Sequence, residues 1–449
     1  MNFLYITIIS VVIFILAFAI KNKWSFLDIF FVFLPFKTIQ IDFGLMIWLF
    51  YIPWVILFFR YFKFILIFRN PVTFYFFWTF VVTIFFSFYY YTEFNSNYSN
   101  YFRSSFGRSY ISIIKYFIFQ IAPIFLLSII IKSHSQIFSA LRSYIFGLKV
   151  LTILGIAQLI IYVISGYDFL PYGLTEDLDP LSATEDMIFQ NIGFLRISSL
   201  GGEPKGLAVS LVIGITMLLY LKMSKNHASF KWINVWIILM LFVLITTLST
   251  SGFFLILVPF LIVVVYNFYK VTENIPTKII LLLTFIFAFF VFQDLIYVII
   301  DARILTRSNV LLSEDIDDSI IKFLENNPIH LFFGTGLGNI HLHAINYIQD
   351  SILYNLRLNE IFISRYGYLK IVSESGIFGF LLFLIFIVQT TKGIFLEVGL
   401  ISKYIVFLFF LTMSIFYLLR AGYCEIEFYF FTGLIIAYLK LCKKERLLY

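Results

Sequence analysis

Charged residues are scarce in this sequence of 449 residues: Asp, Glu, Lys and Arg make up 13% of it, whereas apolar residues make up 61%. A water-soluble domain of this size could not bury so much apolar surface. The composition therefore excludes a soluble globular protein and predicts an integral membrane protein. Cysteine is scarce too, since Cys424 and Cys442 are the only two, which excludes a disulfide framework and a cysteine-based metal site.

Other signals are also missing. No positive charge precedes the first apolar run, 3–20, whereas Lys21 and Lys23 follow it. A signal peptide has the opposite order, so we expect a retained membrane anchor. The formal net charge of +7 is explained by Lys and Arg in cytoplasmic loops, so nucleic acid is not an expected partner. There is no internal repeat and no low-complexity tract.

The apolar residues gather in runs that are long enough, or nearly so, to cross a membrane. A spanning helix needs about 20 apolar residues, which predicts an all-α polytopic protein with about 11–13 transmembrane helices in one transmembrane domain, residues 1–449. The pair 26–41 and 43–59 is uncertain because Pro35, Lys37 and Asp42 interrupt it. The predicted spans lie at 3–20, 26–41, 43–59, 72–90, 111–131, 144–164, 206–221, 232–248, 251–269, 279–299, 369–390, 404–419 and 425–441.

Basic residues between these spans predict the orientation. Clusters of them fall on alternate connections from Arg60 onward, and an excess of Lys and Arg marks the cytoplasmic side. The tail is basic as well, which predicts a cytoplasmic C-terminus. The basic residues concerned are Arg60, Lys63, Arg69, Lys132, Arg142, Lys222, Lys225, Lys231, Lys270, Lys278, Lys392, Lys403, Lys440, Lys443, Lys444 and Arg446.

Two of the intervening, external connections are much longer than a connection needs: the middle loop, 165–205, and the late loop, 300–368. Loops of this length usually carry function. Most acidic residues also lie there. Against that acidic background, the external Arg196, Lys205, Arg357 and Arg365 stand out.

The late loop is predicted to contain short helices. Ser313 can cap a helix with an acidic first turn and one apolar face, which Asn326-Asn327-Pro328 would end. A second segment has apolar residues at helical spacing and is expected to lie along the membrane surface. The apolar positions are Ile316, Ile320, Phe323 and Leu324 in the first helix, and Ile345, Ile348, Ile352 and Leu356 in the second.

Residues 196–206 read Arg-Ile-Ser-Ser-Leu-Gly-Gly-Glu-Pro-Lys-Gly and lead directly into an apolar run. We interpret them as a mobile loop entering the first turn of a membrane helix, for which Pro204 is suited. A helix start offers free N–H groups and a positive dipole end, which suits an anion such as phosphate. An ordinary connecting loop is the alternative.

Residues 334–338, Gly-Thr-Gly-Leu-Gly, are not followed by Lys-Ser/Thr, so a nucleotide-binding loop is excluded and a structural turn is favoured. Nearby, His341 and His343 alternate, and on a helix they would point about 200° apart, which disfavours a metal site. One of them could instead accept a proton near neutral pH. Surface or interfacial histidines are the favoured alternative.

Residues 365–379 enter the eleventh predicted span. Arg365 lies at its outer edge, and Glu374 lies deeper, where a carboxylate costs about 2.5–3.5 kcal/mol. A partner or a cavity should therefore meet Glu374. Ser373, Gly376 and Gly379 suit close helix–helix packing.

These motifs occur in an order that resembles a known family. Arg…Gly-Glu-Pro-Lys-Gly-Leu-Ala stands at a helix start, Ser-Thr-Ser-Gly opens the span at 251, and Gly-Thr-Gly-Leu-Gly lies in the late loop. Tyr-Leu-x4-Glu-x-Gly-x-x-Gly enters the next span. From about residue 190 to 390 the chain resembles the O-antigen and capsular polysaccharide repeat-unit polymerases (Wzy-type), which are related to the O-antigen ligases.

The resemblance implies a metal-independent glycosyltransferase without a cofactor, which joins undecaprenyl-pyrophosphate-linked oligosaccharides at the outer face of the bacterial inner membrane. Such polymerases often have an Arg followed eleven positions later by Gly in both large loops. Arg365 and Gly376 match that spacing, and Arg196 and Gly206 are one residue short. Ligases typically have His-Asn where this chain has Arg365-Tyr366, which favours a polymerase. Besides the ligase, the alternative is a flippase for lipid-linked oligosaccharides.

Our hypothesis for the site combines both loops. Arg side chains suit phosphate oxygens, so cations of the two loops would clamp the pyrophosphate. Membrane lipids and a chain-length regulator are further expected partners. Glu203 would accept a proton from the attacking hydroxyl, or else hold the loop by pairing with Arg196; His341 or His343 is the other candidate base. The clamp would comprise Arg196, Lys205, Gly206 and Arg365, with Arg357 ranked last, and Tyr366, Glu374 and Gly376 would support it.

Overall fold

The computed structural model describes residues 2–36, 40–42, 46–48, 51–62, 72–93, 113–170, 195–201, 204–223, 232–249, 314–348, 364, 366–398 and 400–446. Within these ranges the chain is almost entirely helical, and its only sheet is a small antiparallel pair of strands. The chain divides into two compact units, each described here by itself. Unit 1 comprises Met1–Leu57, Ser135–Val310 and Leu400–Phe409, and unit 2 comprises Phe58–His134, Leu311–Gly399 and Phe410–Tyr449.

Among the described residues, four helices are long and apolar enough to cross a membrane. They are Ile113–Ile130, His134–Ser165, Pro204–Lys222 and Gly367–Glu397. Each covers one predicted span, so the expectation of a helical membrane protein is supported. The predicted spans at 251–269 and 279–299 lie outside the described residues, as does much of the two large loops.

The uncertain pair of spans near the N-terminus does not form as two long helices. Helix α1 (Asn2–Lys21) is followed by the short α2 (Phe26–Phe33), whose Ser25 and Asp28 form a reciprocal capping box. Strands β1 (Gln40–Asp42) and β2 (Met46–Trp48) then pair, and α3 (Tyr51–Tyr61) follows. The interruption has a physical cause, because Pro35 ends a helix and the polar residues after it favour a turn.

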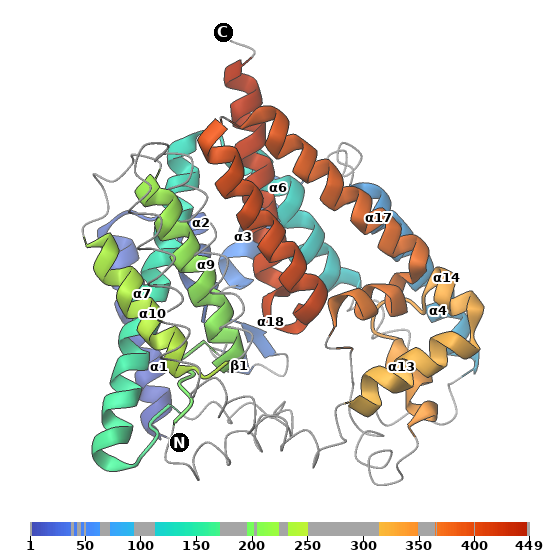
Figure 1. Cartoon of the computed structure of the whole chain (residues 1–449), viewed down its shortest axis with the longest axis horizontal. Helices are drawn as coiled ribbons and strands as arrows, with labels where there is room; N and C mark the ends of the chain where they lie inside the picture. Colours follow the sequence, from blue (N-terminus) through green and yellow to red (C-terminus); the bar gives the residue numbers. More distant parts are fainter. Residues whose placement is uncertain are drawn as a thin grey trace, which may run out of the picture. The chain divides into compact units, whose positions relative to one another are not determined.

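In unit 1, the long helix α7 (His134–Ser165) packs with α9 (Pro204–Met223) and α10 (Ile233–Thr246). Small residues allow this close packing. A Cβ on Gly155 would lie 3.1 Å from side-chain carbons of both Ile197 and Val243. Figure 1 shows these helices side by side in green and teal.

In unit 2, α4 (Val72–Glu93) packs against α17 (Gly367–Glu397), and a π-helical turn, η2 (Phe117–Ile121), leads into α6 (Ala122–Ile130). Pro123 at the start of α6 explains the π turn, since it cannot donate to the preceding turn. The segment α18 (Leu400–Arg446) is 47 residues long.

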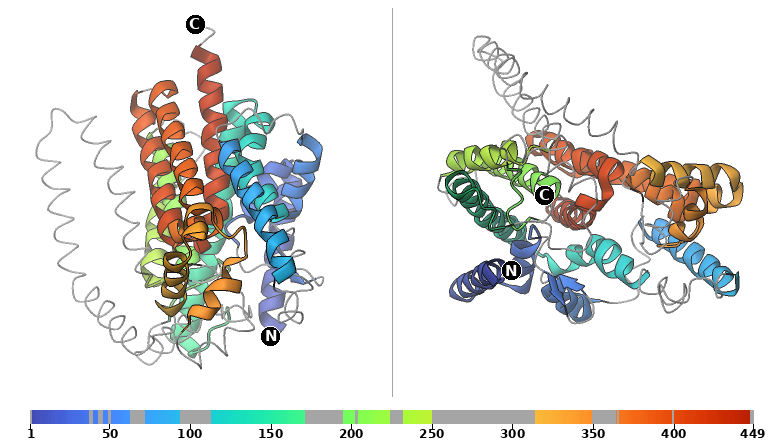
Figure 2. Two further views of the ribbon diagram at one scale, coloured as in Figure 1. Left: turned by 90° about the vertical axis from the view of Figure 1, so that its right-hand side faces the viewer. Right: turned by 90° about the horizontal axis from the view of Figure 1, so that it is seen from below.

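Helix α18 is not a straight rod. The rings of Tyr417 and Phe428 stack with centroids 4.6 Å apart, although eleven residues of straight helix would separate them by about 16 Å. The chain must therefore reverse between them, as the predicted spans at 404–419 and 425–441 require, and the folded-back segment is visible in Figures 1 and 2. Phe383 of α17 packs on both rings.

The late loop forms a small helical lobe in unit 2. Helix α13 (Glu314–Asn326) has the predicted bounds and buries Ile320, Phe323 and Leu324. It is followed by α14 (Pro328–Phe333), α15 (Ile340–Ala344) and the 3₁₀ turn η6 (Ile345–Tyr347). The second predicted helix is wrong at its start: Ile345 and Ile348 lie buried in the α13 cluster rather than on a membrane surface. Ile352 and Leu356 lie outside the described residues.

Candidate functional site

The first part of the middle-loop motif is a packed strap, residues 195–201, in unit 1. Arg196 is 3% exposed, and Ser198 and Ser199 are buried as well. The Ile197 N–H donates to the carbonyl of Thr246 at 3.2 Å, and the Ser199 hydroxyl donates to the carbonyl of Leu151 at 2.9 Å. Backbone groups among apolar helices must be hydrogen-bonded. The prediction of a mobile loop is therefore wrong for this part of the motif.

A buried glutamine holds the strap to the end of α7. The Oε1 atom of Gln158 accepts from the Ser199 N–H at 2.9 Å, while its Nε2 donates to Asp168 at 2.8 Å and to the carbonyl of Leu170 at 3.2 Å. Burial raises the pKa of the Asp168 carboxyl above its ordinary 3.8. The hydrogen bonds from Gln158 and from the Leu170 N–H lower this pKa, but their effect is smaller than that of burial. One amide side chain thus satisfies three groups.

The helix start after the strap matches the prediction. Helix α9 begins at Pro204, whose missing N–H is harmless in a first turn. Lys205 is half-buried and Gly206 is buried. A Cβ on Gly201 would lie 2.9 Å from Leu207, so glycine lets the strap approach the helix. Glu203 lies outside the described residues.

In unit 2, the glycine turn, residues 334–338, docks on a break in α17. Gly376 has φ 74° and interrupts that helix. The three carbonyls before the break accept hydrogen bonds from other segments. The carbonyl of Ser373 accepts from the Thr335 N–H at 2.8 Å, and that of Glu374 accepts from the Gly336 N–H at 2.9 Å. The third, Ser375, accepts from the indole Nε1–H of Trp78 at 2.8 Å. The glycine turn and Trp78 therefore cap the first part of α17.

Glycine is required on both sides of this contact. Gly334, Gly336 and Gly338 have φ values of 86°, 86° and 71°, in the left-handed region. A Cβ on Gly334 would overlap the backbone of Glu374, and one on Gly376 would overlap the carbonyl of Phe332. The structural interpretation of the turn is confirmed. Gly376 packs closely against another helix, as expected, since its Cβ would meet the backbone of Phe332 and Phe333 at the end of α14, but it also breaks α17.

Glu374 has a hydrogen-bond partner, as expected for a carboxylate deep in a predicted span. Its side chain is buried, with 7% of the residue exposed, and its Oε1 accepts from the Gly338 N–H at 3.4 Å. The glycine turn of the late loop and the Glu374 motif at the start of α17 are thus one structural element. Gly379 also packs closely, since a Cβ on it would lie 3.1 Å from the Cδ1 atom of Trp78, as the helix-packing interpretation expects.

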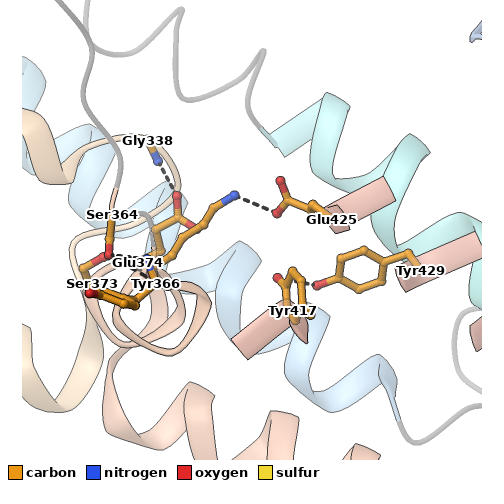
Figure 3. Close-up of polar contacts among 9 residues, drawn as sticks. Gly338, Ser364, Tyr366, Ser373, Glu374, Tyr417, Glu425 and Tyr429 are labelled. Carbon is orange, nitrogen blue, oxygen red and sulfur yellow. Dashed lines mark hydrogen bonds and ion pairs between the residues drawn. The ribbon is translucent and has the colours of Figure 1, made fainter. Parts of the chain in front are cut away.

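A buried ion pair next to Glu374 was missed by sequence reasoning. The Lys370 Nζ donates to Glu425 Oε1 at 2.6 Å, and the two side chains are 14% and 19% exposed. Figure 3 shows Glu425 opposite Glu374, with the hydrogen-bonded hydroxyls of Tyr417 and Tyr429 alongside. Since charges inside spans usually pair, opposite charges at 370 and 425, each at the start of a predicted span, were a usable signal.

The two alternating histidines have different surroundings, as their spacing on α15 requires. His341 is 7% exposed and its Nδ1 lies 3.1 Å from the carbonyl of Gly338. His343 stacks on Phe323, with ring centroids 5.0 Å apart, and its ring centroid lies 5.5 Å from that of His330. Burial, and then the His330 ring, lower the pKa of His343 from 6.5 to about 3, which makes it a weak base. Among the described residues, no three His, Cys, Asp or Glu side chains gather as a metal site.

Tyr366 precedes α17 and is fixed by Ser364. The Ser364 hydroxyl accepts from the Tyr366 N–H at 3.1 Å, and it donates to Asp317 of α13 at 2.7 Å. The start of α17 is therefore tied to the late-loop lobe. Arg365 and Arg357 lie outside the described residues. Arg196, Lys205 and Gly206 belong to unit 1, whereas His341, His343, Tyr366, Glu374 and Gly376 belong to unit 2.

No model of a known protein family matches the chain, and no curated protein matches it either.

Proposed function

We propose that this protein is a Wzy-type polymerase, a membrane glycosyltransferase that joins undecaprenyl-pyrophosphate-linked oligosaccharide repeat units into O-antigen or capsular polysaccharide. It would act at the outer face of a bacterial inner membrane, without a metal or cofactor. The acceptor hydroxyl would attack the sugar carbon of the donor, and lipid pyrophosphate would leave.

One contact supports this proposal more than any other. Gly338 and Glu374, from the two late motifs of the resemblance, are 36 positions apart in the sequence, yet the Gly336 and Gly338 amides both donate to Glu374. Motifs that form one element can serve one site. The adjacent Lys370–Glu425 pair adds buried charge at the same end of α17, where charge is costly and is usually retained for function.

The proposed roles follow from chemistry. Arg196, Lys205 and Arg365 would stabilise the charge that develops on the leaving pyrophosphate, and the start of α9 at Gly206 would contribute backbone amides. Losing one such donor typically costs about 2.7–4 kcal/mol of transition-state stabilisation. Arg357 would be a weaker contributor.

The surroundings of His341 and His343 make them unequal as candidate bases. His343 has its pKa lowered to about 3, and a base with so low a pKa accepts protons poorly at neutral pH. His341 is the better of the two, since it adjoins the glycine turn. Glu203 is the other candidate, with pairing to Arg196 as its alternative role.

The clamp is tested by polysaccharide length in cells that carry Arg196→Ala or Arg365→Ala, with Arg60→Ala as a matched control. We expect short-chain material only from the first two variants, at unchanged protein levels. Long chains in both variants would exclude the clamp. For the base, full activity in Glu203→Gln and in His341→Ala/His343→Ala would eliminate all three candidates.

A second function, a flippase for the same lipid-linked oligosaccharides, is favoured by one observation. Helix α17 is discontinuous at Gly376, and discontinuous spans with buried charge are typical of transporters. Incubating the purified protein with a lipid-linked repeat unit separates the functions. A ladder of polymers supports the polymerase, transfer to lipid A core indicates a ligase, and movement across vesicles without a new bond indicates a flippase.

A further inference from the structure

Three buried side-chain oxygen atoms of unit 2 have no hydrogen-bond partner among the described residues. They are the hydroxyl of Tyr116, directly before the π turn η2, the Oε1 of Gln120 within that turn, and the Oγ1 of Thr432 on α18. Tyr116 and Thr432 are only 5% and 1% exposed. A buried polar atom that is left unpaired destabilises a folded protein, so these atoms point to a polar ligand beside them.

The helix that carries Tyr116 packs alongside the last part of α18. Tyr116 lies close enough to Tyr429 for the two hydroxyls to interact electrostatically. One to two turns further along, a Cβ on Gly433 would overlap the carbonyl of Pro123. The two helices therefore run in the same direction and share one interface.

Gln120 and Thr432 lie between these two contacts. Gln120 follows Tyr116 by four positions, and Thr432 follows Tyr429 by three, which places each pair on one face of its helix. The backbone is also irregular here, because η2 is a π turn and Pro123 has no N–H to donate. Such π turns are frequent at functional sites. The unpartnered oxygen atoms thus gather at an irregular turn of a predicted span.

Buried tyrosines lead from this interface to the ion pair between α17 and α18. The hydroxyls of Tyr417 and Tyr429 lie 3.1 Å apart. Tyr75 of α4 adjoins Tyr116, with ring centroids 6.4 Å apart, and its hydroxyl lies within electrostatic range of the ion pair. All four side chains are at most 5% exposed. A hydroxyl can both donate and accept, so these groups can continue a hydrogen-bond chain.

We propose that Tyr116, Gln120 and Thr432 bind internal water, which joins the buried tyrosines and the Lys370–Glu425 pair into one hydrogen-bonded chain. Buried water typically makes about three hydrogen bonds. The site matches this need, because its two hydroxyls can donate or accept and its amide oxygen accepts. The chain stabilises the ion pair, whose charges are costly among apolar helices. This inference does not depend on the proposed function.

The first test detects the water in the purified full-length protein, in phospholipid nanodiscs and in water enriched in heavy oxygen. An X-ray pulse turns bound water into hydroxyl radicals, which add heavy oxygen to the side chains beside it. We expect label on Tyr116 or Tyr429 and none on Trp54, a control that is 0% exposed. Label on neither tyrosine, or equal label on Trp54, would overturn the inference.

The second test uses the sign of a stability change. If the Thr432 hydroxyl had no partner, Thr432→Val would stabilise the protein or leave it unchanged. If the hydroxyl binds water, Thr432→Val and Gln120→Leu should lower the unfolding temperature and reduce the label on Tyr116. Thr390→Val is the matched control, because that buried hydroxyl donates to the carbonyl of Phe386 in its own helix at 3.0 Å, and it should leave the label unchanged. Unfolding temperatures that stay the same or rise in both site variants would contradict water binding.

The link to the ion pair is tested in the background Lys370→Met/Glu425→Leu, in which no charge needs the chain. Thr432→Val should lower the unfolding temperature less in this background than in the otherwise unchanged protein. Equal losses in the two backgrounds would show that the water and the ion pair are independent, and the chain would be refuted.

Discussion

Both units place a non-helical segment among apolar helices, and they satisfy its polar groups in different ways. In unit 1, the strap is held by the neutral side chain of Gln158, while the helix α7 stays intact. In unit 2, the glycine turn is held by carbonyls of α17, which breaks at Gly376 to provide them. The first arrangement depends on one side chain, and the second depends on glycines.

The two regions also differ in charge. Gln158 contacts one titratable group, Asp168, and the strap carries the buried Arg196. The broken part of α17 carries Lys370, in a close ion pair with Glu425. A buried amide needs hydrogen-bond partners, and a buried charge costs still more when it is left without one. Unit 2 should therefore be the more easily damaged by a single substitution at its site.

The largest effect is expected for Lys370→Met. Removal of one partner leaves the part-buried Glu425 without its ammonium, which costs up to about 3–5 kcal/mol, the loss typical of a fully buried pair. Thermal unfolding of the purified protein in detergent should show this loss. The double variant Lys370→Met/Glu425→Leu should recover most of the stability, because an apolar pair replaces the ionic one. If the double variant is as unstable as the single one, the ion pair is not the cause.

Gly376→Ala should have the next largest effect. The φ of 74° at this position costs a residue with a side chain about 1–3 kcal/mol, and the Cβ would also overlap the carbonyl of Phe332. Gly393→Ala is the matched control on the same helix, since its Cβ would meet only the end of Leu439, at 3.1 Å. The control should be neutral or stabilising, by up to about 1 kcal/mol. Equal unfolding temperatures of the two variants would contradict the prediction.

A smaller loss is expected for Gln158→Leu in unit 1. This variant removes the acceptor of the Ser199 N–H, and a buried group left unpaired costs about 1–3 kcal/mol. Thr152→Val is a suitable control, because this buried hydroxyl only donates to the carbonyl of Leu148 in its own helix and should cost less than about 1 kcal/mol. Urea or thermal unfolding compares them, and a control as damaging as Gln158→Leu would refute the role of the amide.

The smallest effect is expected for Asp168→Asn, and it depends on pH. Burial raises the pKa of Asp168 above 3.8, so the folded protein binds this proton more tightly than the unfolded chain does. The stability from this group is present at low pH and is lost as the pH rises from 3.8 through the folded value. The Asn variant should lack this loss. If the unfolding temperatures of both proteins change with pH in parallel, Asp168 is not the source of the pH dependence.

Local patterns predicted several elements correctly. The apolar and acidic positions of α13 determined its bounds, and Pro204 determined the start of α9. The reversal within α18 also followed from the interruption between two apolar runs. In each case the residues that decide the structure are neighbours in the sequence, so periodicity and helix-end chemistry suffice.

Predictions that depended on distant residues fared differently. Gly376 was expected to pack against a helix, and it meets the end of α14, but it also breaks α17, whose carbonyls before the break bind the glycine turn. The strap was expected to be mobile, but Gln158, some forty residues earlier, holds it. Lys370 and Glu425 are 55 residues apart, and their pairing depends on how two helices meet.

By itself, the sequence determined that this protein is helical and built for a membrane, because apolar composition and run length act locally and need no knowledge of neighbours. The tertiary structure alone decided how buried polar groups are satisfied: which carbonyls cap the glycine turn, which amide holds the strap, and which carboxylate meets Lys370. A polar group in an apolar interior must find a partner, but its chemistry does not say where in the chain that partner lies.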